Sequence, residues 1–148
     1  MKAVIQRVKY ANVKINENIV GSIQKGFLVL LGVGKEDNQN DVDYLVKKVT
    51  NLRVFEDENG KMNLALKDIE GKLLVISQFT LYADCSKGNR PSFINAGNPD
   101  KSKELYLKFI EECTKYDIEV QVGEFGAGMK VELLNDGPVT IIIDSKEK

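Results

Sequence analysis

Residues 26–33 read Gly-Phe-Leu-Val-Leu-Leu-Gly-Val, a continuous apolar run that ends at Gly34. A short apolar run without polar alternation is typical of a strand that is buried on both faces. Lys72–Phe79 (KLLVISQF) has the same character and predicts a second buried strand. These two segments are therefore expected to form the centre of a β-sheet.

Further strands are predicted at both ends of the chain. They are Met1–Val8, a hairpin of Val13–Ile15 and Ile19–Ile23 around Asn16-Glu17-Asn18, and then Glu119–Val122, Met129–Leu134 and Val139–Ile143. Asn135-Asp136-Gly137-Pro138 predicts a tight turn between the last two of these strands, because a Gly-Pro pair is a turn signal.

Two segments have helical periodicity. Asp41 opens the first, in which apolar residues recur at i, i+3, i+4 and i+7 from Val42 to Leu52. The second is Asp100–Tyr116, with an inner stripe that includes Leu105 and Phe109. The sequence therefore predicts an α/β fold, a single domain over residues 1–148, in which two helices cover one face of mixed β-sheets.

The composition is that of a globular protein, with 43% apolar and 29% charged residues. No segment approaches the ~20 apolar residues that a membrane span needs, and the N-terminus becomes polar too early for a signal peptide. We therefore expect a cytoplasmic protein without a membrane partner. A net charge of −1 gives no global signature of nucleic-acid binding, although gripping only a nucleic-acid end requires no basic surface.

The sequence contains no histidine, which removes every mechanism based on a Ser-His or Cys-His pair and every His-ligated zinc site. Cys85 and Cys113 form no CxxC pair, and Cys113 falls on the helical stripe. We expect no metal and no cofactor. An enzyme with this inventory would use hydroxyls, backbone groups, carboxylates or the substrate itself.

Ser77-Gln78-Phe79-Thr80 follows the second buried strand, at a place where α/β folds often position reactive groups. Taken alone, these residues favour a structural role in satisfying backbone groups at the strand end, and leave catalysis open. Gly126 and Gly128 allow a close backbone approach to a strand or a ligand. The loop 82–99 carries Lys87 and Arg90, which are either solvated or in contact with phosphate.

Taken together, these segments resemble the D-aminoacyl-tRNA deacylase family, also called D-Tyr-tRNA deacylases, over nearly the whole chain. The most specific motifs are SQFTLYAD at 77–84 and NDGPVT at 135–140. Other matching segments are MKAVIQRV, GFLVLLGV, LRVFEDENGKMNLAL, KGNRPSF and GEFGAGMKVELLNDGPVTI. The resemblance implies a three-layer α/β/β fold and a homodimer with active sites at the subunit interface.

The resemblance also implies the site residues. Ser77, Gln78, Phe79 and Thr80 would line the pocket for the aminoacylated 3′-terminal adenosine of tRNA. Phe125 and Met129 would lie on its adenosine side. Gly137-Pro138 of the partner subunit would enter the pocket through a cis peptide and screen the chirality of the amino acid, and Arg7 would hold that element in place.

The reaction that follows from the resemblance is hydrolysis of the ester bond of D-aminoacyl-tRNA. An activated ester needs water, positioning and oxyanion stabilisation more than a strong base. We expect the terminal ribose 2′-hydroxyl to assist and Thr80 to position, because no base is visible to activate a threonine nucleophile. L-substrates would clash with Gly137-Pro138, whereas glycyl-tRNA would escape exclusion. The alternatives are a non-catalytic nucleic-acid-binding homodimer and, more weakly, a structural subunit.

Overall fold

The computed structural model describes residues 1–148 and places β3 (Gly26–Gly32) and β6 (Lys72–Ser77) side by side and parallel in a mixed sheet. Both strands are buried on both faces, as predicted. Phe27 and Val29 belong to a hydrophobic cluster beneath the helices, whereas Leu28 and Leu74 belong to a second cluster on the opposite face. Alternating side chains of one strand therefore join two cores.

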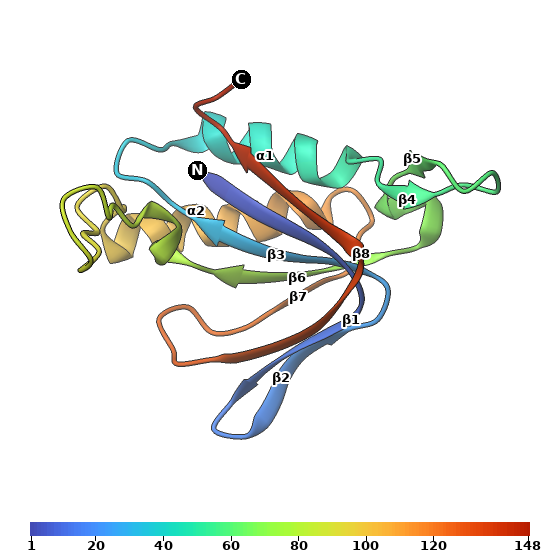
Figure 1. Cartoon of the computed structure of the whole chain (residues 1–148), viewed down its shortest axis with the longest axis horizontal. Helices are drawn as coiled ribbons and strands as arrows, with labels where there is room; N and C mark the ends of the chain where they lie inside the picture. The colour runs from blue at the N-terminus through green and yellow to red at the C-terminus, as the bar shows by residue number, and fades with distance from the viewer.

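The sheet has the strand order β2 (Asn18–Ile23), β1 (Lys2–Ile15), β3, β6 and β7 (Val120–Val122), with β8 (Lys130–Asp144) paired to β1 (Figure 1). The hairpin around Asn16-Glu17-Asn18 is confirmed. Its first arm is continuous with the N-terminal strand, since β1 runs unbroken from Lys2 to Ile15. The short strands β4 (Phe55–Glu56) and β5 (Met62–Leu64) form a separate antiparallel pair, followed by the 3-10 helix η1 (Leu66–Ile69).

Helices α1 (Gln39–Asn51) and α2 (Pro99–Thr114) lie on the same face of the sheet, which confirms the predicted arrangement (Figure 1). Helix α1 begins two residues before Asp41. Asn38 is its N-cap and accepts from the Asn40 N–H at 2.9 Å, while the Asp41 carboxylate accepts from the Asn38 N–H at 2.9 Å. Asp41 is thus the third residue of a capping box. Neither helix has the length and hydropathy needed to cross a membrane.

The second buried strand is shorter than predicted. It ends at Ser77, and Phe79–Tyr82 form a 3-10 turn, η2, instead of continuing the strand. Gln78 lies between the two elements, and its N–H donates to the Leu31 carbonyl at 2.8 Å. The chain therefore leaves the sheet at the point where its polar residues begin.

The predicted turn at Asn135-Asp136-Gly137-Pro138 is wrong. Residues 130–144 form one strand, β8, with a bulge at this motif. Gln6 pairs with Thr140 and Val8 with Asn135, so the chain takes five steps along β8 (140 − 135) for two steps along β1 (8 − 6). The extra residues loop out without reversing the chain. The Gly137–Pro138 peptide bond is cis.

Candidate active site

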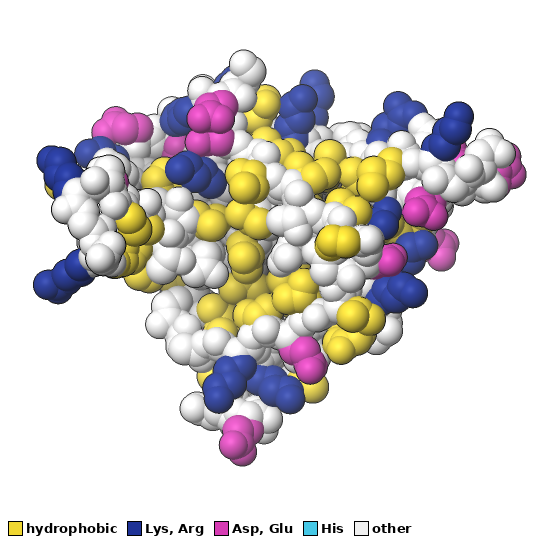
Figure 2. Space-filling model, in the orientation of Figure 1, with side chains coloured by type: hydrophobic (Ala, Val, Ile, Leu, Met, Phe, Trp, Pro, Cys, Tyr) yellow, Lys and Arg dark blue, Asp and Glu magenta, His cyan; other side chains and the backbone are white.

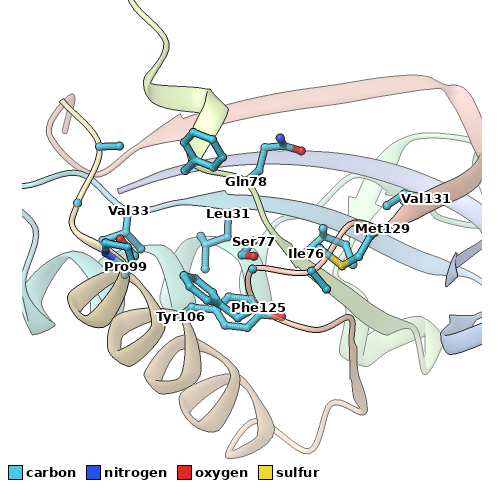
Figure 3. A pocket seen from close by; sticks show the side chains of 16 residues that line it. Leu31, Val33, Ile76, Ser77, Gln78, Pro99, Tyr106, Phe125, Met129 and Val131 are labelled. Carbon is cyan, nitrogen blue, oxygen red and sulfur yellow. The ribbon is translucent and has the colours of Figure 1, made fainter. Parts of the chain in front are cut away.

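A cavity of about 530 Å³ lies at the carboxyl ends of the parallel strands β3 and β6. Open α/β sheets commonly bind ligands at this edge, because the strands fix the backbone where the chain turns away. Its apolar lining comes from β3, β6, α2 and the segment before and within β8 (Figure 3). The main side chains of this lining are Leu31, Val33, Ile76, Tyr106, Phe125, Met129 and Val131.

Three of the four residues predicted to be catalytic line this cavity. Ser77 lies at its centre in Figure 3, with Gln78 above it, and the exposed side chain of Phe79 completes this wall. Thr80 is exposed and does not line the cavity of the protomer. Its hydroxyl instead accepts a hydrogen bond from the Gln78 side-chain amide, so Thr80 is linked to the wall through Gln78.

The structure brings Phe125 and Met129 to the same cavity. The Phe125 ring lies 5.8 Å from that of Tyr106 in a tilted arrangement (Figure 3). The Tyr106 hydroxyl donates to the Val75 carbonyl at 2.9 Å, and burial raises its pKa to about 12. Tyr106 therefore stays neutral, and its hydrogen bond fixes the position of its ring against Phe125. These two rings form the aromatic floor of the cavity. Tyr106 was not predicted as a site residue, because its place on the buried side of α2 indicates only packing.

The helix side of the cavity is formed where the loop 83–98 meets α2. Asn98 is the N-cap of α2 and accepts from the Lys101 N–H at 2.9 Å, and Pro99 occupies the first turn. The Phe93 ring of this loop contacts the Phe79 ring edge-on, at 4.9 Å between centroids. Ala96 and Gly97 line the cavity and are attached to the end of β3, where the Gly97 N–H donates to the Val33 carbonyl at 2.9 Å. The long loop is thus part of the site.

Gly137 and Pro138 do not reach the cavity of their own protomer. Their bulge is held by Arg7, whose side chain is buried. Arg7 Nε donates to the Asp136 carbonyl at 2.8 Å and Nη1 donates to the Val54 carbonyl at 2.6 Å. Because Arg7 pairs with Phe27 near the start of β3, the bulge lies at the opposite end of that strand from Leu31, roughly 13 Å away at ~3.3 Å per residue.

A buried polar cluster behind η2 was not predicted. The Asp37 carboxylate is 1% exposed and accepts from the Gly34 N–H at 2.6 Å and from the Tyr82 hydroxyl at 3.3 Å. It also forms an ion pair with the ammonium of Met1 at 2.7 Å. Burial and the neighbouring carboxylate of Asp37 raise the pKa of Tyr82, which keeps its hydroxyl protonated as the donor. The cluster thereby anchors the last residue of η2.

Gly34 is required for this contact, because a Cβ there would lie 2.8 Å from the Tyr82 ring. The cluster continues into α1 and the C-terminal segment. The Ser145 hydroxyl donates to Asp41 Oδ1 at 2.6 Å, and Lys146 Nζ lies 3.0 Å from the Asp41 carboxylate. Burial opposes ionisation of Asp41, but these partners and the Asn38 N–H hold its pKa at about 2. The carboxylate is therefore charged at neutral pH.

We expect Tyr82→Phe to lower the free energy of unfolding by about 1 kcal/mol, because it removes a hydrogen bond to a buried carboxylate and leaves the ring in place. Urea denaturation measures the effect. Tyr10→Phe is the matched control, since Tyr10 is partly exposed and its hydroxyl has no hydrogen-bond partner. Equal stability of the two variants would show that the Tyr82 hydroxyl does not anchor η2.

No side chain that is charged at neutral pH lines the cavity; its sixteen lining residues are apolar side chains, glycines, two serines, one glutamine and one tyrosine. Cys113 is buried beneath the helices, and burial raises the pKa of its thiol to about 12. Cys85 is exposed in the loop 83–98 and does not line the cavity. No three histidine, cysteine or carboxylate side chains converge into a metal-ligating group. What the cavity offers is hydroxyl, amide and aromatic groups.

The candidate site is thus a neutral, partly aromatic cavity at the ends of the parallel strands of a mixed α/β sheet. Residues 4–144 match the family model described as D-Tyr-tRNA(Tyr) deacylase. The chain belongs to this family, which confirms the resemblance seen in the sequence.

Two curated relatives support this assignment over their whole length. The chain is 65% identical to the D-aminoacyl-tRNA deacylase of Fusobacterium nucleatum, covering 99% of this chain and 97% of the relative. It is 58% identical to the D-aminoacyl-tRNA deacylase of Thermosipho africanus, covering 99% of both chains.

Two solved structures are similar in fold. The c-Myc DNA Unwinding Element Binding Protein has a TM-score of 0.92 at 40% identity, covering 97% of this chain and 98% of that one. A probable eukaryotic D-amino acid tRNA deacylase has a TM-score of 0.80 at 15% identity, covering 96% of this chain and 97% of that one. The second likeness shows the fold alone.

Proposed function

We propose that residues 1–148 form a single cytoplasmic deacylase domain that hydrolyses the ester bond of D-aminoacyl-tRNA, releasing the free D-amino acid and tRNA. What supports this most directly is the neutral cavity beside Ser77, Gln78 and Phe79, in a chain whose relatives are named deacylases. The aromatic floor of Tyr106 and Phe125 suits a stacked adenine, since an aromatic face stacks well on a nucleobase.

The cavity wall contains no group that can act as a general base. We therefore assign the activation of water to the 2′-hydroxyl of the terminal ribose, which lies next to the ester in the substrate itself. The N–H groups of Phe79 and Thr80, which open η2 and so lack acceptors within that turn, serve as donors to the oxyanion. Thr80 positions this segment through its hydrogen bond with Gln78.

The selectivity for D-substrates is assigned to a second copy of the chain. Gly137-Pro138 is exposed and lies far from its own cavity, so it can line only the cavity of a partner. The outer edge of β8 has no partner strand, and exposed apolar side chains, Leu134 and Ile142, lie along this strand. Figure 2 shows hydrophobic side chains gathered over the middle of the same face.

An unpaired edge of this length is a template for strand pairing between chains, and exposed apolar surface favours association. We infer a homodimer of three-layer α/β/β protomers that buries this face. Backbone atoms of the partner's Gly137 and Pro138 then occupy the space that an L side chain needs. Glycine has no side chain to exclude, so glycyl-tRNA is also cleaved.

The proposed activity is tested by comparing D-tyrosyl-tRNA with L-tyrosyl-tRNA. We expect hydrolysis of the D-ester at least about 100-fold faster than that of the L-ester, because a steric clash of a few kcal/mol corresponds to this ratio. Exhaustive treatment with EDTA should leave the rate unchanged. Loss of activity with EDTA and its recovery with zinc would contradict the assigned chemistry.

The second candidate function is a nucleic-acid-binding homodimer without catalysis. The observation that favours it is the likeness to the c-Myc DNA Unwinding Element Binding Protein, at 40% identity. The same experiment separates the two functions. Tight binding of tRNA with no hydrolysis of any D-aminoacyl ester would support the binding module.

A further inference from the structure

A shallow depression adjoins the cavity on the side of the β1–β2 hairpin. Its lining consists of Lys14, Asn16, Glu17, Gly128, Met129 and Lys130. Met129 lines both the depression and the cavity, so the two are neighbours. A ligand chain that leaves the cavity past Met129 is therefore brought close to the depression.

Two cations face each other in this depression. Lys14 of β1 and Lys130 of β8 are directly opposite residues of an antiparallel pair, and both are exposed. Their side chains leave the sheet on the same face, at a separation where like charges destabilise a sheet. Neither lysine forms an ion pair or a side-chain hydrogen bond, and the nearby Glu17 forms none either.

We propose that this depression binds the phosphates of the nucleotides that precede the terminal adenosine in the single-stranded 3′ end of tRNA. The inference rests on the proposed function, because it takes the adenosine to occupy the cavity. A phosphodiester supplies the anion that relieves the repulsion between Lys14 and Lys130. Because the chain has a net charge of −1, contact with the RNA depends on local cations.

The test separates phosphate contacts from chemistry by using two substrates, D-tyrosyl-tRNA and D-tyrosyl-adenosine, which carries the same ester but no phosphate. For Lys14→Gln/Lys130→Gln we expect a KM for the tRNA about 3- to 10-fold higher and a salt dependence of log KM weaker by about 1, with kcat unchanged. The rate on D-tyrosyl-adenosine should stay at the wild-type value. Glu17→Gln should shift the KM for the tRNA in the opposite direction.

A double variant with the same loss of charge is the control. Lys47→Gln/Lys67→Gln removes exposed cations from α1 and η1, which line neither the cavity nor the depression. It should not change the KM by more than about twofold. An equal effect of the control, or an equal loss on D-tyrosyl-adenosine, overturns the inference.

A failure of the deacylase assignment can be distinguished from a failure of the phosphate contact. If the wild type hydrolyses neither substrate, the deacylase assignment fails, and binding still tests the depression. Fluorescence anisotropy with a labelled single-stranded oligoribonucleotide ending in CCA measures that binding. Weaker binding by Lys14→Gln/Lys130→Gln than by Lys47→Gln/Lys67→Gln supports the phosphate contact, whereas equal binding refutes it.

Discussion

For a D-aminoacyl-tRNA that ends in 2′-deoxyadenosine and is charged at the 3′ position, we expect a small enzymatic rate enhancement. The enhancement of ester hydrolysis should be at least about 100-fold smaller than for the ribose substrate. The reason is the composition of the cavity wall, which contains no carboxylate, lysine, arginine or cysteine, in a chain without histidine. Positioned general acid–base groups contribute about 10²–10⁴-fold to such reactions, and here the substrate hydroxyl is the group available.

The measurement must correct for the intrinsic reactivity of the two esters. Spontaneous hydrolysis is therefore followed for both substrates under the same conditions, and the rate enhancements are compared. The matched control is a tRNA with the 2′-deoxy substitution one nucleotide earlier, which removes a hydroxyl that does not adjoin the ester. Full enhancement on the terminal 2′-deoxy substrate would eliminate assistance by the ribose.

If the ribose hydroxyl assists hydrolysis, substitution of Thr80 should have only a limited effect on kcat. Thr80→Ala should reduce kcat by about tenfold or less, because the hydroxyl positions Gln78 and takes no part in bond formation. Mass spectrometry of quenched wild-type reactions should show no aminoacyl group on Thr80. A covalent adduct there would instead identify a nucleophile.

Gly137→Ala should lower kcat/KM for D-substrates by about 10- to 100-fold, which corresponds to ~1.4–2.7 kcal/mol of transition-state stabilisation. Gly137 has a φ of 144°, which L side chains rarely adopt. An added Cβ would lie 2.7 Å from Val139 Cγ2 and 3.1 Å from Arg7 Nη2. The bulge must therefore shift, and Arg7→Lys, which cannot reach both carbonyls, should act in the same direction.

Gly60→Ala controls for backbone strain alone. Gly60 has a φ of 73° in the turn after β4, with no atom within 4 Å of an added Cβ. It should lose stability without losing activity or selectivity. A Gly137→Ala variant with the wild-type rate and D/L ratio would show that the bulge does not contact the substrate.

Complementation then tests whether the bulge acts on a partner's cavity. Gly137→Ala subunits are mixed with Ser77→Leu subunits, whose cavity is filled by the larger side chain. If the bulge acts in trans, one site of each mixed dimer combines a wild-type cavity with a wild-type bulge, and activity returns to about a quarter of the wild-type level. If it acts in cis, every site carries one substitution and the mixture stays inactive.

The centre of the fold and much of the cavity wall could be predicted from the sequence. Apolar runs and helical periodicity depend on local residue order, so β3, β6 and both helices followed from their patterns. The ends of elements were less accurate: Gln78 ends β6 early and Asn38 caps α1 ahead of Asp41. The family motifs identified Ser77, Gln78, Phe125 and Met129, which do line one cavity.

The course of residues 135–138 depends on tertiary contacts and could not be predicted from the sequence. A Gly-Pro pair is a turn signal in its local context, but here Arg7, 129 residues away from Asp136 in the sequence, binds the looped-out carbonyl while β8 continues its pairing with β1. Likewise, Tyr106 reaches the cavity and Asp37 reaches Tyr82 through folding of distant segments. Contacts between residues so far apart in the sequence leave no signature in local residue order. These contacts place the bulge, the cavity and η2 relative to one another.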